Sequence, residues 1–260
     1  MGINLGKIIC VFNQKGGVGK TTTTINLSAY LASMGKRILV ADIDPQGNTT
    51  SGFSIDKSEL EYSMYHLIMG FDPKLSIKST EIENLDVIPG TVELAGAEIE
   101  LTAKLSRETK VKEGLDKVKD DYDYIFIDCP PSLGLLTINS LTAADSVLIP
   151  IQCEFYALEG VGQLMKTIQL VKRSLNPSLE IQGVVMSMFD GRTNLSIEVV
   201  EEVKKYFKGK VYSTIIPRNV RLAEAPSHGI PIMIYDKSSR GAKAYEELAE
   251  EFLEYDEEEI

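Results

Sequence analysis

The sequence has no Trp, only two His and only three Cys among its 260 residues. An odd number of cysteines without CxxC spacing does not make a disulfide framework. His66 and His228 stand alone, without the spacing of zinc ligands. Cys10 lies within an apolar run and Cys153 follows another. We therefore expect these thiols to pack in a core rather than to hold an iron–sulfur cluster, and we expect the same of Cys129.

Long apolar runs and low-complexity segments are absent too. The sequence has no run of about 18 apolar residues, the length that a membrane-spanning helix needs. Its first residues, MGINLGKIICVF, lack the pattern of a cleavable secretory peptide. With 43% hydrophobic residues the chain is too apolar to be disordered. We expect a cytoplasmic protein, with residues 1–260 forming a single domain around one substantial core.

The formal net charge of −11 argues, as a bulk value, against nucleic acid and anionic membrane as partners. Its distribution along the chain is uneven. Residues 246–260 hold nine acidic residues and no Lys or Arg, so the rest of the chain carries 27 bases against 29 acids. Residues 203–245 carry nine bases against two acids. The sequence thus predicts a basic segment beside an acidic C-terminal tail.

Short apolar runs rich in β-branched residues alternate with amphipathic stretches. Most of the runs are apolar throughout, which is typical of strands covered on both faces. The alternation predicts an α/β fold: a mostly parallel twisted sheet with helices on both faces. Residues 53–84 look helical and irregular. The expected strands are residues 7–13, 37–42, 85–89, 124–128, 146–151, 181–186 and 211–216, and the clearest expected helices are 21–34, 135–143, 160–174 and 196–207.

The strongest motif is KGGVGKTT, residues 15–22. It fits GxxxxGK[ST], with Asn13 or Gln14 at the first glycine position, and it joins an expected strand to an expected helix, as the motif requires. Glycines let backbone N–H groups cradle phosphate oxygens, and the helix N-terminus favours negative charge. Lys20 would neutralise the β- and γ-phosphates, and the Thr21 hydroxyl would ligate Mg²⁺. The alternative is a glycine-rich turn without a ligand.

Acidic residues follow two of the expected strands. Asp128 ends the run YIFID, where a carboxylate beside a P-loop serves Mg²⁺ or its water. Asp42 and Asp44 open the stretch DIDPQGN, where an acid can orient an attacking water. A turn or a helix cap is the alternative for each. Lys15, which an ordinary P-loop does not need, is placed to reach phosphates bound by a facing subunit, unless it is a solvated surface lysine.

Six stretches together resemble one known family, in the family's own order, from about residue 7 to residue 250. By them the chain resembles the ParA/Soj family of deviant Walker A ATPases, in the MinD/ParA superfamily of P-loop NTPases. The stretches are KGGVGKTT (15–22), DIDPQGN (42–48), NLDVIPGTVELAGAEIEL (84–101), YDYIFIDCPPSLGLLTINSL (122–141), PIQCEFYALEG (150–160) and IPRNVRLAEAPSHGIPI (216–232).

The resemblance implies three catalytic residues. Lys15 would cross to the partner's ATP in a nucleotide sandwich dimer, Asp44 would act in water activation, and Asp128 would be the Walker B acid. It also implies that adenine rests near Ser187 and Met188. Spacing alone would instead make Pro217 a strand end and Asn219 a helix cap. The residues that it implies for ATP binding are Lys15, Gly16, Gly17, Val18, Gly19, Lys20, Thr21, Thr22, Pro217 and Asn219, with Thr21 on Mg²⁺.

The resemblance further implies a homodimer that forms with ATP and binds double-stranded DNA without sequence preference. Such binding needs only Lys and Arg along the phosphates. Arg192 and Arg218 match positions tied to DNA binding, and Arg221 would extend the patch, unless these charges simply form a solvated face. A ParB-like centromere-binding partner would stimulate slow, Mg²⁺-dependent hydrolysis. The implied function is chromosome or plasmid segregation by a cytoplasmic, nucleoid-associated ATPase.

Three other functions compete with this interpretation. A membrane-positioning ATPase of the MinD type ends in a basic amphipathic helix, whereas EEFLEYDEEEI would be repelled by anionic lipid, so we expect no membrane partner. A P-loop ligase or kinase would need further catalytic groups, and the sequence shows none beyond the nucleotide motifs. A nucleotide-gated binding module would hardly hydrolyse ATP, but Asp44 and Asp128 favour turnover.

Overall fold

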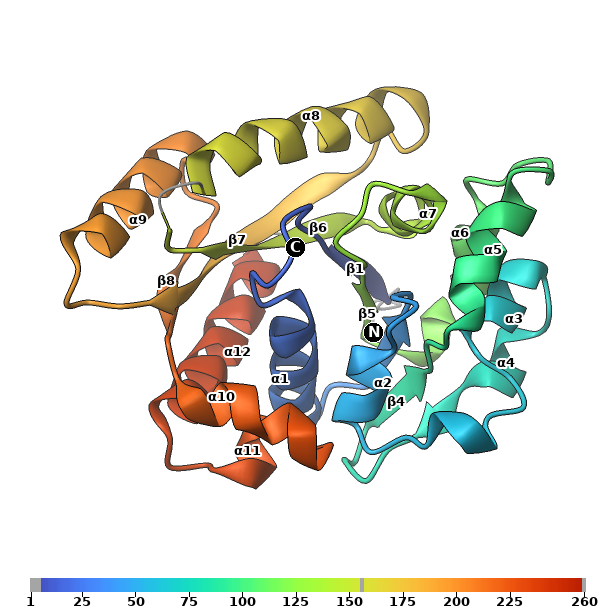
Figure 1. The fold of residues 1–260 in the computed structure, drawn as a ribbon, viewed down its shortest axis with the longest axis horizontal. Coiled ribbons are helices and arrows are strands. Elements are labelled where there is room, and N and C mark those ends of the chain that lie inside the picture. The colour runs from blue at the N-terminus through green and yellow to red at the C-terminus, as the bar shows by residue number, and fades with distance from the viewer. Residues whose placement is uncertain (1–5, 155–156, 259–260) are drawn as a thin grey trace.

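The structure, a computed structural model, describes residues 6–154 and 157–258. These residues form a sheet of eight strands in the order β3-β4-β2-β5-β1-β6-β7-β8 (Figure 1). All neighbouring strands pair in parallel except β3 and β4. The expected α/β fold with a mostly parallel sheet is confirmed. The strands are β1 (Lys7–Val11), β2 (Ile38–Asp42), β3 (Lys78–Ser79), β4 (Leu85–Ile88), β5 (Tyr124–Asp128), β6 (Ser146–Gln152), β7 (Glu180–Phe189) and β8 (Val211–Pro217).

Helices cover both faces of the sheet, with α8 and α9 lying across it from α1 and α12 (Figure 1). The helices are α1 (Lys20–Ser33), α2 (Asn48–Gly52), α3 (Met64–Met69), α4 (Pro73–Ser76), α5 (Glu93–Leu101), α6 (Lys110–Leu115), α7 (Leu135–Ala143), α8 (Ala157–Ser174), α9 (Asn194–Phe207), α10 (Val220–Glu224), α11 (Ile232–Tyr235) and α12 (Arg240–Glu258). Short 3₁₀ turns are η1 (Lys57–Glu59), η2 (Lys119–Asp121) and η3 (Ala225–His228).

Two apolar cores lie on opposite faces of the sheet because successive residues of a strand point to opposite sides. In β1, Ile8 and Cys10 enter the core that α3 and α5–α9 cover. Ile9 and Val11 enter the core that α1 and α12 cover. All three cysteines are free and buried, as expected from the sequence. Burial raises the pKa of Cys153 to about 12, which is typical of an inert core thiol.

Residues 53–84, the least readable part of the sequence, are a series of short elements. The short helices η1, α3 and α4 confirm the prediction that this segment is partly helical. The antiparallel edge strand β3 was not expected. Elements of two to six residues are too short to display a hydrophobic period. Elsewhere each expected strand is present, with ends that differ by a few residues.

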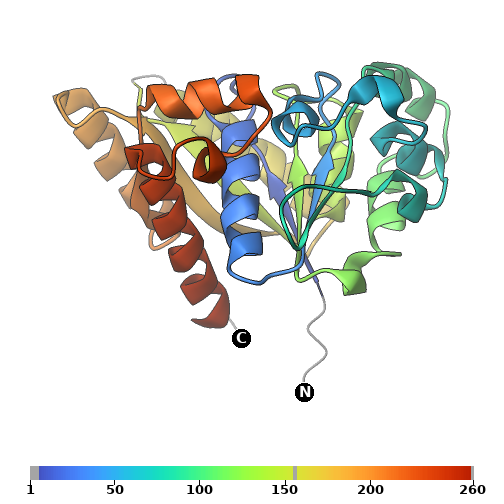
Figure 2. The same cartoon turned by 90° about the horizontal axis from the view of Figure 1, so that it is seen from below.

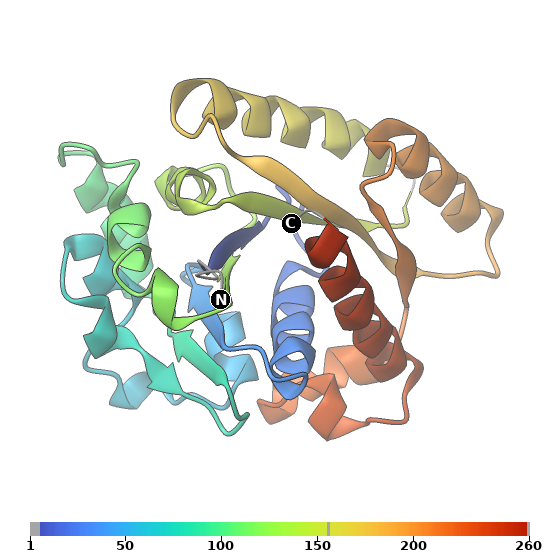
Figure 3. The same ribbon diagram turned by 180° about the vertical axis from the view of Figure 1, so that it is seen from behind.

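The acidic segment is helical over residues 246–258, as the last part of α12. Figure 3 shows this helix beside β8 and α1. Its apolar side chains, including Leu248 and Phe252, are buried against the sheet. Glu251 accepts hydrogen bonds from the backbone N–H groups of Ser213 and Thr214, at 2.5 and 2.9 Å, on edge strand β8. Part of the acidic charge therefore stabilises the fold.

The sheet brings the motif-bearing loops to one edge. Asp128 is in register with Val11 on one side and with Asp42 on the other, so three strands end side by side. In Figure 2, β1 rises to this edge and α1 descends from it. The chain runs from β1 to β2 on one side and from β5 to β6 on the other. Open α/β sheets bind ligands at such a switch point.

Replacing Phe252 with Ala tests whether α12 is part of the core. The ring is fully buried, with its centroid 5.3 Å from that of Tyr124 and 6.0 Å from that of Phe126. We expect Phe252→Ala to lower the free energy of unfolding by about 3–5 kcal/mol in urea titrations. The exposed Glu254→Ala control should change it by less than about 0.5 kcal/mol. Equal, small effects of both variants would contradict the packing of α12.

Candidate nucleotide-binding site

The loop between β1 and α1 has the backbone of an anion cradle. Gly17 and Gly19 have φ values of +72° and +93°, in the left-handed region that favours glycine. Asn13, at the first glycine position of the motif, ties the loop down. Its Nδ2 donates to the Pro150 carbonyl at 2.8 Å, and its Oδ1 accepts from the Lys15 N–H at 3.0 Å. The loop is thus held by β6 as well as by β1.

A cavity of about 310 Å³ lies beneath this loop. Lys20, only 7% exposed, lines it and donates from Nζ to the Lys15 carbonyl at 3.1 Å. Burial lowers the pKa of Lys20, and the negative charge of Asp128 opposes that effect. Backbone amides around a buried cation suit a phosphate group. The lining residues are Gly16, Gly17, Gly19, Lys20, Thr21, Thr22, Asp44, Asn48, Pro131 and Met188.

Asp128 is fully buried and accepts hydrogen bonds from three threonines. Its Oδ2 accepts from the hydroxyls of Thr21 at 2.8 Å and Thr49 at 2.6 Å. Its Oδ1 accepts from the Thr24 hydroxyl at 3.4 Å. Burial raises the pKa of Asp128, whereas the hydrogen bonds from Thr49 and Thr21 lower it. The structure therefore brings Thr21 and Asp128 together, and their oxygens are of the kind that Mg²⁺ prefers.

The two acids of DIDPQGN have different positions. Asp42 is fully buried, and its Oδ2 accepts from the N–H and the hydroxyl of Thr50 at 2.8 and 2.7 Å. Burial, together with the nearby charge of Asp128, raises the pKa of Asp42. Asp44 lines the cavity, and its Oδ1 accepts from the Gln46 N–H at 2.9 Å. Asp42 thus anchors the loop, and Asp44 faces the site.

A second cavity, of about 370 Å³, adjoins the first and shares Gly19, Thr22 and Met188 with it. Pro217 and Asn219 lie in its wall. Pro217 also ends β8, and Asn219 also caps α10 by accepting from the Arg221 N–H at 2.8 Å. The wall is largely apolar, which suits a flat heterocyclic base. Its other residues are Ser187, Ile216, Arg218, Val220, Leu222, Ala223 and Tyr245.

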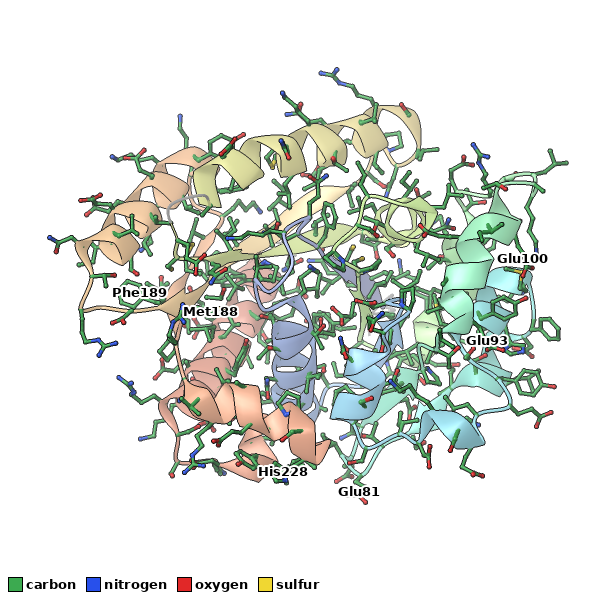
Figure 4. The ribbon with its side chains drawn as sticks, viewed as in Figure 1. Glu81, Glu93, Glu100, Met188, Phe189 and His228 are labelled. Carbon is green, nitrogen blue, oxygen red and sulfur yellow. The ribbon has the colours of Figure 1, made fainter. Side chains whose placement is uncertain are left out.

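Met188 lines both cavities, and its neighbour Ser187 lines the second one. The Ser187 hydroxyl donates to the Val18 carbonyl at 2.8 Å and so supports the phosphate loop. Met188 has φ +53°, which is unusual for a residue with a side chain. Figure 4 shows Met188 and Phe189 where the chain leaves β7, above α10 in this view. Backbone strain of this kind concentrates at functional sites.

Lys15 does not line its own protomer's phosphate cavity. Its side chain is 38% exposed, and its Nζ lies 3.2 Å from Oε2 of Glu154. The lysine is therefore at the rim, outside the cavity that Lys20 lines.

The three arginines expected to bind DNA are all exposed, and each has an acidic neighbour. Arg192 binds Asp190 at 2.6 Å, and Arg221 binds Glu224 at 2.8 Å. Arg218 lies 3.7 Å from Glu154. Arg192 and Arg218 occupy neighbouring loops after β7 and β8, whereas Arg221 belongs to α10.

Sequence reasoning missed several residues of the site. Thr24 and Thr49 donate to Asp128, and Tyr245 of α12 lines the second cavity. Thr49 directly follows the DIDPQGN stretch, so its place next to that motif could have indicated that it belongs to the site. Tyr245 reaches the site only through the tertiary fold, and no local pattern marks it. Glu154 lies within the stretch PIQCEFYALEG, but nothing in that stretch predicts its ion pairs with Lys15 and Arg218.

Two negative findings hold for residues 6–154 and 157–258. No group of three or more His, Cys, Asp and Glu side chains is arranged there to hold a metal ion. In the same residues, no helix combines the length and apolar character needed to cross a membrane.

The comparisons with known proteins agree with this geometry. The profile of a family described as an AAA domain matches residues 6–181. The sporulation initiation inhibitor protein Soj of Bacillus subtilis is 61% identical, over 95% of this chain and 98% of its own. The chain belongs to the ParA/Soj family of ATPases. The chromosome partitioning protein ParA of Myxococcus xanthus is another family member, 51% identical over 97% of this chain and 89% of its own length. The chromosome-partitioning ATPase Soj of Treponema pallidum is 49% identical over 97% of this chain and 99% of its own length.

Solved structures place this ParA/Soj-family chain in the wider superfamily. A cobyrinic acid a,c-diamide synthase from Mycobacterium smegmatis, with bound ADP and magnesium, has a TM-score of 0.85 and 36% identity, covering 98% of this chain and 97% of its own. The cell division ATPase MinD of Pyrococcus furiosus has a TM-score of 0.79 and 28% identity, covering 96% and 99%. The resemblance seen in the sequence, including its P-loop fold, is confirmed.

Thr49→Val tests the hydrogen bonds on Asp128. Loss of the hydroxyl removes a donor that lowers the pKa of Asp128, so the acidic limb of the ATPase pH profile should move to higher pH. The free energy of unfolding should fall by about 1–3 kcal/mol because a buried acceptor loses a partner. Thr49→Ser keeps the hydroxyl and should restore both. An unshifted pH profile in Thr49→Val would contradict the assignment.

Proposed function

We propose that this ATPase binds ATP with Mg²⁺, dimerises with ATP, and binds double-stranded DNA without sequence preference. In this proposal it is a cytoplasmic, nucleoid-associated protein that segregates chromosomal or plasmid DNA with a ParB-like partner, and residues 1–260 act as one domain. The observation that carries the proposal is the hydrogen bond from Thr21 to the buried Asp128 at the phosphate cavity, which adjoins a base-sized cavity. The 61% identity to Soj supports it.

Each part of the nucleotide has residues of suitable chemistry. The backbone of residues 16–22 and the ammonium of Lys20 suit the phosphates. Thr21 and Asp128 would hold Mg²⁺, which supplies charge neutralisation at the phosphates. Asp44, which lines the same cavity, would orient a water for attack. The Mycobacterium smegmatis relative, with bound ADP and magnesium at 36% identity, supports this arrangement.

The outer face of the loop supports the proposed dimer. Lys15 is at the rim of the cavity rather than within it. At Gly16 an added Cβ would meet nothing nearer than Pro131 Cβ at 3.8 Å, so a second subunit can approach this point. Lys15 of one protomer would then reach the phosphates of the other.

The position of charge along the fold supports DNA binding despite the negative net charge. Arg192 and Arg218 lie at the edge of the sheet that carries the nucleotide site. Helix α12, which holds the acidic residues, runs away from that edge in Figure 2. A DNA duplex at this edge would therefore lie near these arginines and away from the acidic cluster of α12.

The structural relative named as a diamide synthase favours a second candidate, ATP-dependent amide synthesis. That relative is 36% identical to the chain, against 61% for Soj. The second cavity is mainly apolar, and Arg218 and Tyr245 are the titratable side chains in its wall. ATP consumption coupled to amide formation on an added carboxylic acid would support this candidate over segregation.

Gly16→Val tests the proposed dimer. An added Cβ at Gly16 has no neighbour nearer than 3.8 Å, so the variant should fold and bind ATP, but its side chain should block the facing subunit. Light scattering with ATP should show a dimer for the unaltered protein and a monomer for the variant. Lys20→Ala, which should lose ATP binding altogether, separates a failure to dimerise from a failure to bind. A dimer of Gly16→Val with ATP would contradict the proposed contact.

Arg218→Glu tests the DNA surface. Reversing this exposed charge should weaken binding to a mixed-sequence duplex by about tenfold or more and should lower the salt dependence of binding. ATP-dependent dimerisation should persist. Arg173→Glu makes the same charge change at an exposed site near the end of α8 and serves as the matched control. Equal losses in both variants would refute a specific role for Arg218.

A further inference from the structure

The carboxylate of Asp42 holds both ends of the segment that carries Asp44. Its Oδ1 accepts a hydrogen bond from the Asp44 N–H at 3.2 Å, where the segment starts. Its Oδ2 accepts from the N–H and the hydroxyl of Thr50, at 2.8 and 2.7 Å, where the segment ends. Asp42 is itself fixed, because it is fully buried at the end of β2 in register with Asp128 of β5. Residues 44–50 are therefore closed into a loop by one buried side chain.

The hydroxyl of Thr50 connects this loop to a third strand. While it donates to Asp42, it accepts a hydrogen bond from the Gly90 N–H at 2.8 Å. Gly90 follows β4, the strand beside β2 in the sheet. The hydroxyl is fully buried and acts as donor and acceptor at once, so its loss would leave polar groups unpaired. We call Asp42, Thr50 and Gly90 the clasp.

The clasp is closely packed, and this close approach requires glycine at position 90. A Cβ on Gly90 would lie 2.7 Å from the carbonyl oxygen of Asp42 and 2.8 Å from its Cγ. The carbonyl oxygen of Gly90 would lie 2.5 Å from a Cβ on Gly47, within the segment that carries Asp44. The loop after β4 therefore lies directly against the loop after β2. Such dense packing limits the movement of both loops.

The clasped segment carries two groups of the proposed nucleotide site. Asp44 lines the phosphate cavity, and the Thr49 hydroxyl donates to Oδ2 of Asp128 at 2.6 Å. Asp42 and Thr50 themselves line neither the phosphate cavity nor the base-sized one. The clasp can therefore act on hydrolysis only through the groups that it holds in place.

We propose that Asp42 and the Thr50 hydroxyl are positioning residues for ATP hydrolysis, which hold the backbone of Asp44 so that its carboxylate lies in the phosphate cavity. This inference rests on the proposed function, because it assumes that Asp44 orients the attacking water. Displacing a reacting group by about 1 Å can lower a rate by about 100-fold. Loss of the clasp should therefore lower kcat and leave ATP binding, which depends on the P-loop, almost unchanged.

The test compares Thr50→Val with Thr50→Ser in ATPase assays with Mg²⁺. Valine resembles threonine in shape but can neither donate to Asp42 nor accept from Gly90. We expect kcat to fall by about tenfold and KM for ATP to change by less than about twofold. Serine keeps the hydroxyl and should restore kcat to within about twofold. Thr50→Ala also lacks the hydroxyl and should lower kcat as valine does, which keeps the test valid if valine does not fit.

A matched control separates this effect from a simple loss of stability. Thr142→Val removes another buried hydroxyl, which donates to the Ile138 carbonyl of α7 at 2.7 Å. It should lower the free energy of unfolding and leave kcat unchanged. Counting the sites that bind ATP in each sample expresses kcat per folded molecule. A loss of kcat that Thr142→Val reproduces would overturn the inference.

A double-mutant cycle shows whether the clasp acts through Asp44. In an Asp44→Asn background, Thr50→Val should lower the residual single-turnover rate no further, because the group that it displaces is already inactive. The same fold-loss with and without the Asp44 carboxylate would contradict a positioning role.

The proposed function and this inference fail in different ways. If Asp44→Asn abolishes hydrolysis but Thr50→Val hydrolyses ATP at the unaltered rate, the inference fails and the proposed function stands. If Asp44→Asn itself hydrolyses ATP at the unaltered rate, the proposed role of Asp44 is refuted and the inference falls with it.

Discussion

The carboxylate of Asp128 is fully buried, and the arrangement of the site follows from the need to compensate it. Three threonine hydroxyls, from the start of α1 and from α2, donate to its two oxygens. These bonds draw the P-loop helix and the loop after β2 toward the end of β5. Burial still raises the pKa of Asp128, so a divalent cation beside it would remove much of the remaining cost. In the proposed function, the same contacts that stabilise the fold would also hold the residues that bind Mg²⁺.

Parallel strands extend this arrangement along one edge of the sheet. Because all their carboxyl ends lie on that edge, loops far apart in sequence become neighbours. The order β1, β6, β7, β8 places the phosphate loop, Glu154, Arg192 and Arg218 in a row. The cations and acids of this row pair with one another. The edge thus brings charged side chains from distant parts of the sequence within ion-pairing distance of one another.

Features with a local cause were predictable from the sequence. Apolar strand runs, the glycine-rich loop and Asp128 at a strand end each follow from residues adjacent in the chain, and the sheet and the phosphate cavity agree with them. Tertiary features were not predictable. The residues of β3 are too few to show a period, and Glu154 meets Arg218 only once the sheet has formed. The acidic run masked the apolar stripe of Leu248 and Phe252 that makes α12 a core helix. Whether Lys15, Asp44 and Pro217 act as predicted stays a prediction.

The charge of the protein is informative only once it is placed on the fold, since one acidic cluster lies toward the end of α12 whereas Arg192 and Arg218 lie on loops at the edge that carries the nucleotide site. The most direct test of the whole account is DNA retention by the unaltered protein with ATP, with ADP and without nucleotide, across a salt series. The account predicts strong retention with ATP alone, falling steeply as salt rises. Equal retention in the three nucleotide states, or retention that salt does not change, would contradict it.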